Sequence, residues 1–268
     1  SNLVFPYRYR WSMNFDALPE IIQGGMGIGV SSWPLARAVA LQGQLGVVSG
    51  TALDNLLIRR LQDGDLGGHV RRALDAFPIP SVAQEIRERF FQPDGREEGE
   101  PYTVAPMYKK VVEQFRDHLT VAANFVEVWL AKEGHDGPVG INYLTKLQMP
   151  TLSSVYGAML AGVDYVLMGA GIPREIPGAL DRFTNHEAAS IRFDIQCNEK
   201  GEEVHLEFDP RAGVDVELPP LKRPRFLPII SSTSLATMMA KKANGKVDGF
   251  SVEGPTAGGH NAPPRGDR

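Results

Sequence analysis

Residues 246–260 decide the fold and read Lys246-Val-Asp-Gly-Phe-Ser-Val-Glu-Gly-Pro-Thr-Ala-Gly-Gly-His260. Val247, Phe250 and Val252 predict a short buried strand, and the proline and glycines that follow forbid helix and strand alike. The chain therefore turns there, and His260 is the first titratable side chain beyond the turn. Many α/β enzymes present their chemistry on such a loop, at the carboxyl end of a strand. A plain turn with a surface histidine is the alternative.

Five earlier segments repeat the pattern of an apolar strand that ends in small or polar residues. The six strands are expected near Ile21, Val47, Ile141, Val166, Ile229 and Phe250. Helices are expected between most of them. Right-handed repetition of strand and helix, with polar groups at the strand ends, is typical of a (β/α)8 TIM barrel. We therefore predict this α/β fold, with an open doubly wound sheet as the alternative.

A glycine-rich loop, Gly24-Gly-Met-Gly-Ile-Gly29, follows the first expected strand. Ser31 or Ser32, with Pro34, then predicts the start of a helix. A strand, a glycine loop and a helix start together form a cradle for an anion or a cofactor, although a tight turn also explains the glycines. A dinucleotide-binding unit would need an acidic residue at the end of the next strand. That strand ends in Ser49-Gly-Thr51, which argues against such a unit.

Two excursions interrupt the repeat. Amphipathic periodicity predicts a helical insertion over 54–137, and alternation around Ile191 and Leu206 predicts a β-hairpin insertion over 182–225. A complete barrel takes roughly 250 residues, and the rest of this chain accommodates only five βα units and a sixth strand. We therefore expect a single barrel domain over 1–268, cut short or proteolysed after the sixth strand, without strands seven and eight.

The composition is that of an ordinary globular chain. Of its 268 residues, 43% are hydrophobic and 22% are charged, which excludes wholesale disorder. The net charge of -4 gives no reason to expect nucleic acid or an anionic membrane surface as a partner. No apolar run is long enough to span a membrane. No signal peptide and no metal site are expected, and with Cys197 as the only cysteine a reducing cytoplasm is the expected location.

Four motifs stand in order on the expected strand ends. They are Ile21-Ile-Gln-Gly-Gly-Met-Gly27, Asn142 as the last residue of the third strand, Gly169-Ala-Gly-Ile-Pro173 after the fourth, and Glu253-Gly-Pro-Thr-Ala-Gly-Gly-His260 after the sixth. Together they resemble the nitronate monooxygenase family, also called 2-nitropropane dioxygenases. The resemblance covers the barrel strands and not the two excursions. It implies an FMN-dependent oxidoreductase that oxidises alkyl nitronates or nitroalkanes with molecular oxygen, releasing nitrite and a carbonyl compound.

The resemblance also implies roles for single residues. The cofactor-binding candidates are Gly24, Gly25 and Met26 with their backbone against the flavin, Asn142 at the edge of its ring system, Glu253 as an acidic contact, and Gly258 and Gly259 beside the ring. His260 matches the catalytic base that removes the α-proton of a neutral nitroalkane. Some members carry a lysine at the end of the fifth strand, where this chain has Ser231. Ser231 is a further cofactor-binding candidate, and what stabilises the reduced flavin stays open.

Two other functions stay open. The first is an FMN-dependent enoyl-acyl-carrier-protein reductase that takes hydride from NAD(P)H and docks a carrier protein on the helical insertion. The second is a catalytically silent module that binds flavin or phosphate. A nitronate monooxygenase would have a small carbon acid and O2 as its partners. The helical insertion could be a lid or a homo-oligomer contact, although structural packing is the expected role of most of its residues. The flavin phosphate is expected to bind residues beyond Arg268, in the missing strands.

Overall fold

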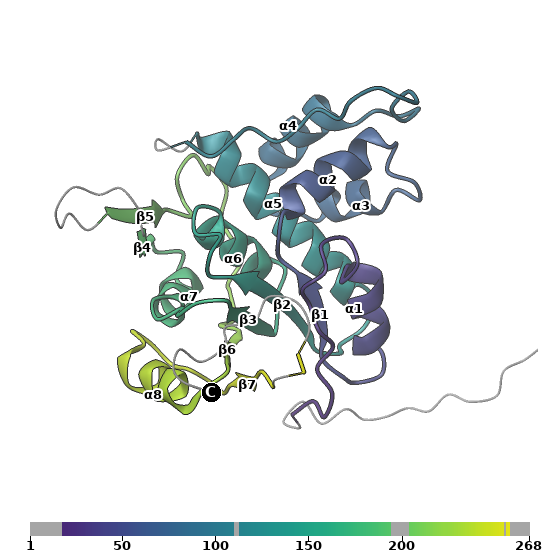
Figure 1. Ribbon diagram of the computed structural model, residues 1–268. Coiled ribbons are helices and arrows are strands. Elements are labelled where there is room, and N and C mark those ends of the chain that lie inside the picture. The colour runs from purple at the N-terminus through teal and green to yellow at the C-terminus, as the bar shows by residue number, and fades with distance from the viewer. Residues whose placement is uncertain (1–17, 110–112, 194–203, 255, 258–268) are drawn as a thin grey trace, which may run out of the picture.

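The computed structural model of the chain describes residues 18–109, 113–193, 204–254 and 256–257. At its centre lies a parallel sheet of β1 (Gly46–Ser49), β2 (Val139–Leu144), β3 (Tyr165–Gly169), β6 (Arg225–Ile230) and β7 (Ser251–Val252), hydrogen-bonded in that order. The sheet curls, and helices surround it (Figure 1). The strand order follows the chain and never reverses, so the doubly wound alternative does not describe this sheet. The described residues form a half-barrel, compatible with part of a TIM barrel.

The first expected strand is only a single bridge, between Ile22 and Leu45. The N–H of Leu45 donates to the Ile21 carbonyl, and the N–H of Gln23 donates to the Leu45 carbonyl, both at 3.0 Å. Ile21 and Ile22 are 62% and 43% exposed. No described strand lies on the other side of this segment, so its pairing with β1 stays short. The described residues do not close a barrel.

The two faces of the sheet carry different apolar side chains, because successive residues of a strand point to opposite sides. The outer face packs against the helices through Val48, Ile141, Val166, Met168 and Phe226. The inner face carries its own small cluster of Leu45, Val47, Tyr165 and Leu167, with Leu227 and Ile229 partly buried against it. Strands that are apolar on both faces are what a parallel sheet requires.

The helices around the outer face are α1 (Trp33–Ala40), α5 (Gln114–Lys132), α6 (Thr151–Leu160), α7 (Ile176–Thr184) and α8 (Thr233–Lys242). As predicted, α1 has Pro34 in its first turn. The Ser232 hydroxyl caps α8 by accepting from the Leu235 N–H at 3.3 Å. Helices α5 and α6 cross closely, since a Cβ on Gly157 would lie 2.1 Å from the Val121 carbonyl oxygen. Only glycine fits at that crossing.

The segment predicted as a helical insertion contains α2 (Leu53–Gln62), α3 (His69–Asp75), α4 (Pro80–Phe90) and also α5. Helix α5 packs against α1 and α6 and contacts β1 and β2. Most of its residues are buried, as expected of a helix with packing partners on several sides. Only α2, α3, α4 and the chain up to α5 stand apart, at the top of Figure 1. The excursion is therefore shorter than predicted, because α5 is the crossover helix from β1 to β2.

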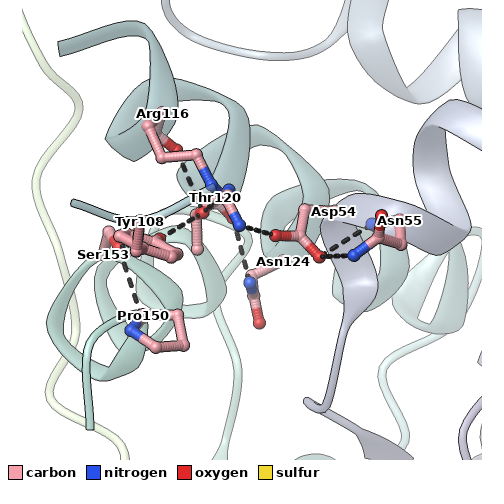
Figure 2. A network of polar contacts seen from close by, with 8 residues as sticks. All are labelled: Asp54, Asn55, Tyr108, Arg116, Thr120, Asn124, Pro150 and Ser153. Carbon is pink, nitrogen blue, oxygen red and sulfur yellow. Dashed lines mark hydrogen bonds and ion pairs between the residues drawn. The ribbon is translucent and has the colours of Figure 1, made fainter. Parts of the chain in front are cut away.

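A buried polar network joins this excursion to the barrel (Figure 2). Arg116 of α5 forms an ion pair with Asp54 of α2, and their side chains are 7% and 8% exposed. Arg116 also donates to the Thr120 hydroxyl at 2.8 Å, and that oxygen lies 2.6 Å from the Tyr108 hydroxyl. The Tyr108 hydroxyl in turn lies 3.5 Å from Ser153 Oγ of α6. Removing one partner of a buried ion pair costs about 3–5 kcal/mol, so the network holds the excursion firmly on α5 and α6.

The predicted β-hairpin lies between α7 and β6. Its strands β4 (Ala189–Phe193) and β5 (Val204–Phe208) pair antiparallel, with Ile191 opposite Leu206. Burial alternates along both strands, so the hairpin has one wet, solvent-exposed face. On the other face, Ile191 and Phe208 join the hydrophobic core of the outer helices.

Candidate functional site

The carboxyl ends of the parallel strands meet at one edge of the half-barrel, which we call the mouth. Asn142 lies in the second half of β2, Ser231 directly follows β6, and Glu253 directly follows β7. In the sheet register Asn142 lies opposite Ser49 of β1. The N–H of Glu253 donates to the Ile230 carbonyl at 2.7 Å. The fold thus brings Asn142, Ser231 and Glu253 to one edge, where barrels of this class carry their sites.

The glycine loop is attached to the ends of β1 and β2. The Met26 carbonyl accepts from the Ser49 hydroxyl at 3.2 Å, and the Met26 sulfur accepts from Asn142 Nδ2 at 2.8 Å. Just before the glycine loop, the side-chain oxygen of Gln23 accepts a hydrogen bond from the Val47 N–H of β1 at 3.0 Å. The loop after the first strand and the end of β2 are therefore in direct contact at the mouth.

The side chain of Asn142 has one unsatisfied atom. The residue is 3% exposed, and its Oδ1 has no hydrogen-bond partner among the described residues. Turning the amide over would place the oxygen against the Met26 sulfur and leave its N–H groups without that acceptor. A buried acceptor without a partner is rare and costs about 1–3 kcal/mol. This oxygen at the mouth therefore calls for a donor that the described residues do not supply.

Gly24 and Gly25 differ in their surroundings. A Cβ on Gly25 would lie 2.4 Å from Val47 Cγ1, so packing against β1 requires this glycine. A Cβ on Gly24 would meet no described atom within 4 Å, and Gly24 does not adopt the left-handed conformation that favours glycine. Gly254, after β7, has the same open surroundings. Packing explains Gly25, whereas Gly24, whose carbonyl accepts from the Ser31 hydroxyl at 2.9 Å, and Gly254 have open space where a side chain would lie.

On the inner face below the mouth, a row of side chains crosses the sheet from β1 to β6. This row is polar at the β1 end and apolar at the β6 end. In register across the sheet it runs Ser49, Asn142, Leu167 and Leu227. Ile229 stands one layer above Leu227 on the same inner face. An apolar surface beside one buried amide suits a ring with apolar faces and polar groups on its edge.

The carboxyl of Asp117 has a raised pKa, and it belongs to the helix packing. Burial raises the pKa of Asp117 to about 6, although a hydrogen bond with Ser153 and the charge of Arg116 act to lower it. Asp117 lies on α5 and Ser153 on α6. The shift reflects burial between two helices, and it does not mark a catalytic acid or base at the mouth.

Sequence reasoning missed two features of this edge. Ser49 holds the glycine loop through its hydroxyl, and a serine at the end of a predicted strand was the available signal. A pocket of about 810 Å³ also opens beside the loops after β2 and β3, with Lys146 and Arg174 in its wall. A cation shortly after each strand was visible in the sequence, but nothing there showed that the two loops share a pocket.

The remaining candidates, Gly258, Gly259 and His260, lie outside the described residues. The role of His260 as a base at the mouth therefore stays a prediction. The described part of this loop does begin to turn as expected, since the Ala257 N–H donates to the Gly254 carbonyl at 3.1 Å.

Comparison with models of known protein families gave no match, and comparison with curated proteins gave none either. Within the described ranges no helix is both long and apolar enough to cross a membrane. Those same ranges hold no group of three or more His, Cys, Asp or Glu side chains that could bind a metal ion.

Proposed function

We propose that this chain is an FMN-dependent oxidoreductase of the nitronate monooxygenase type, which converts alkyl nitronates or nitroalkanes and O2 to a carbonyl compound and nitrite. One observation carries the proposal: the buried Oδ1 of Asn142, without a partner among the described residues, lies at the mouth of a half-barrel, where the space beside the Cα of Gly24 is open. The four sequence motifs that resemble this family support it, because the three within the described residues lie at strand ends on this same edge.

The residues of the mouth fit an isoalloxazine ring. Such a ring has apolar faces and an edge on which an N–H donor stands between carbonyl acceptors, and an amide side chain both accepts and donates hydrogen bonds. Asn142 would serve that edge, and the apolar inner face would lie against the ring. The residues proposed to hold FMN are Gly24, Gly25, Met26, Asn142, Ser231, Glu253, Gly258 and Gly259. When bound, FMN would supply the electron transfer that side chains cannot perform.

His260 is the proposed base. A neutral nitroalkane is a carbon acid, and its α-proton would pass to the imidazole, which leaves the nitronate anion. Histidine suits this step because its ordinary pKa lies near neutral pH. A preformed nitronate needs no such proton transfer. The requirement for His260 should therefore depend on which form of the substrate is supplied.

FMN titration of the purified chain tests the cofactor. We expect bound FMN to show the perturbed visible spectrum and quenched fluorescence of a flavoprotein. Folded protein that leaves the spectrum and fluorescence of added FMN unchanged would contradict the proposal. Anaerobic addition of a nitronate should then bleach the bound flavin, and readmission of O2 should restore its colour.

The reductase remains a second candidate, because the excursion exposes apolar side chains to which a carrier protein could bind. Leu66, Val104 and Met107 are 85%, 65% and 83% exposed. Anaerobic bleaching by NADH or NADPH, without bleaching by a nitronate, would favour an enoyl-acyl-carrier-protein reductase over the monooxygenase. A chain that binds FMN and is bleached by neither would be the silent flavin-binding module. The monooxygenase proposal also includes a cytoplasmic location and a homo-oligomer contact on the excursion.

A further inference from the structure

A second site lies beside the mouth, in the pocket of about 810 Å³ next to the loops after β2 and β3. Four separate segments build it: the loop after β2, the loop after β3 with the start of α7, strand β4 of the hairpin, and Met238 of α8. Its volume lies within the roughly 300–1,000 Å³ of pockets that bind small molecules. None of the flavin contacts proposed within the described residues lies in its wall.

The two loops that form one wall are locked together. The N–H and the hydroxyl of Thr145 both donate to the Gly169 carbonyl, at 2.9 Å and 2.8 Å. A Cβ on Gly171 would lie 2.8 Å from the Thr145 Cβ, so the second loop passes directly over the first. Ala170, between Gly169 and Gly171 in the chain, adopts a left-handed backbone conformation with φ of 60°. This conformation is strained for a residue with a side chain. These contacts fix the two loops of the wall against each other.

The charges in the pocket are mainly positive. Lys146, Arg174 and Arg192 line it, against the single carboxylate of Glu175. That carboxylate is engaged with the main chain, because Glu175 Oε2 accepts from the Arg192 N–H at 2.9 Å. Lys146 and Arg174 are exposed, and neither forms an ion pair with a residue in the described part of the chain. Two cations at the end of one pocket wall are therefore available to an anion.

The rest of the lining is largely apolar. Met168, Ile172, Ile176, Ile191 and Met238 contribute to it. Ile172 is 43% exposed, so part of its side chain is open to contact. A ligand that matches both parts of the pocket has an apolar body and a negatively charged end.

We propose that this pocket binds an organic anion, a carboxylate or phosphate attached to an apolar chain, with the charge at Lys146 and Arg174 and the chain against Ile172, Ile191 and Met238. The inference stands on the pocket alone and does not require flavin. If FMN binds at the mouth, the pocket lies beside it on the same sheet edge, where an anchored anion would be held close to the cofactor.

Isothermal titration of the full chain with hexanoate, hexyl phosphate, hexanol and inorganic phosphate tests the inference. We expect hexanoate and hexyl phosphate to bind and to compete with each other, and hexanol and inorganic phosphate to bind at least about tenfold more weakly. Whichever of the two hexyl anions binds more tightly identifies the natural headgroup. Binding of the anions should weaken as salt is raised, because both cations are exposed.

Matched variants locate the site. Lys146→Gln and Arg174→Gln should each raise the Kd of the preferred anion by about tenfold. Ile172→Asp places a negative charge at the pocket, which would repel the anionic ligand. It should abolish binding without disturbing the fold. Lys222→Gln removes an exposed cation that does not line the pocket, and it should leave the Kd unchanged.

Hexanol binding as tightly as the anions, no binding of any anion to folded protein, or equal affinity in all four variants would each overturn the inference. FMN titration of the same variants separates this result from the flavin proposal. Lys146→Gln and Arg174→Gln should bind FMN like the unaltered chain, so either site can fail while the other stands.

Discussion

The Nδ2 of Asn142 lies 2.8 Å from the sulfur of Met26, which joins the end of β2 to the glycine loop of the first strand segment. This contact uses the donor side of the amide and leaves its acceptor buried without a described partner. The arrangement does not serve stability, because a buried unpaired acceptor costs free energy. Our proposal is that it serves a ligand that carries an N–H donor into the mouth.

Replacing Asn142 tests that interpretation. Asn142→Leu removes the unpaired acceptor at similar size, so the free energy of unfolding without FMN should stay the same or rise by about 1 kcal/mol. The same change should weaken FMN binding by at least about tenfold, because a buried hydrogen bond to the ring is lost. Urea unfolding and FMN titration measure the two effects.

Asn124 supplies the control for this prediction. It is also buried, but its Nδ2 donates to the Thr120 carbonyl and its Oδ1 accepts from the Tyr143 hydroxyl, both at 2.9 Å. Asn124→Leu should therefore lower the free energy of unfolding by about 2 kcal/mol. If Asn142→Leu destabilises the chain as much as Asn124→Leu, the amide at the mouth is a structural residue.

The two neighbouring glycines should respond differently to alanine. Gly25→Ala places a Cβ 2.4 Å from Val47 Cγ1 and should cost about 1–3 kcal/mol of stability. Gly24→Ala meets no described atom within 4 Å, so stability should change by less than about 0.5 kcal/mol. Gly24→Ala should nevertheless weaken FMN binding, because its methyl group would lie where the ring approaches the backbone. Unchanged FMN affinity in Gly24→Ala would remove this loop from the proposed site.

Asp117 should make stability depend on pH. Its pKa is about 6 in the folded chain, because burial raises it above the ordinary value of 3.8. At a pH between these two pKa values, the folded state binds more protons than the unfolded state. The free energy of unfolding therefore falls as pH rises from about 4 to about 6, and it stays lowered above that. Asp117→Asn should therefore be more stable than the unaltered chain above pH 6, by on the order of 2 kcal/mol.

The same comparison near pH 4 is the control for Asp117. There the carboxyl is protonated in the folded state, and the two proteins should unfold at similar urea concentrations. A difference that is constant between pH 4 and pH 7 would show that the substitution acts through packing and not through the charge.

His260→Asn separates proton removal from the later steps. Turnover of a neutral nitroalkane should fall by about 100-fold, because no imidazole accepts the α-proton. This is the order of rate enhancement that a general base contributes. Turnover of the preformed nitronate should change much less. Steady-state rates with both forms of one substrate measure this ratio, and equal losses would assign His260 to substrate binding.

The sequence by itself determined where four of the six expected strands lie. The buried strand expected near Phe250 is only the two-residue β7, in which Val252 is 76% exposed. Val47, Ile141, Val166 and Ile229 lie in parallel strands as predicted, because apolar runs bounded by glycine and polar residues have few other conformations. The cap of α8 at Ser232 and the wet face of the hairpin also follow from local chemistry, since the residues that decide them are close together in the chain.

Only the tertiary structure decided the features that depend on neighbours distant in sequence. From the sequence, helix α5 is predicted to belong to the helical insertion. Its burial against α6 shows that it is the crossover helix. The first strand segment shrinks to one bridge at Ile22, because pairing depends on what lies beside it. The unpaired oxygen of Asn142 and the cations of the second pocket could not be read from the chain. Hydrogen-bond satisfaction and pocket walls are properties of side chains brought together across many residues, and no local pattern records them.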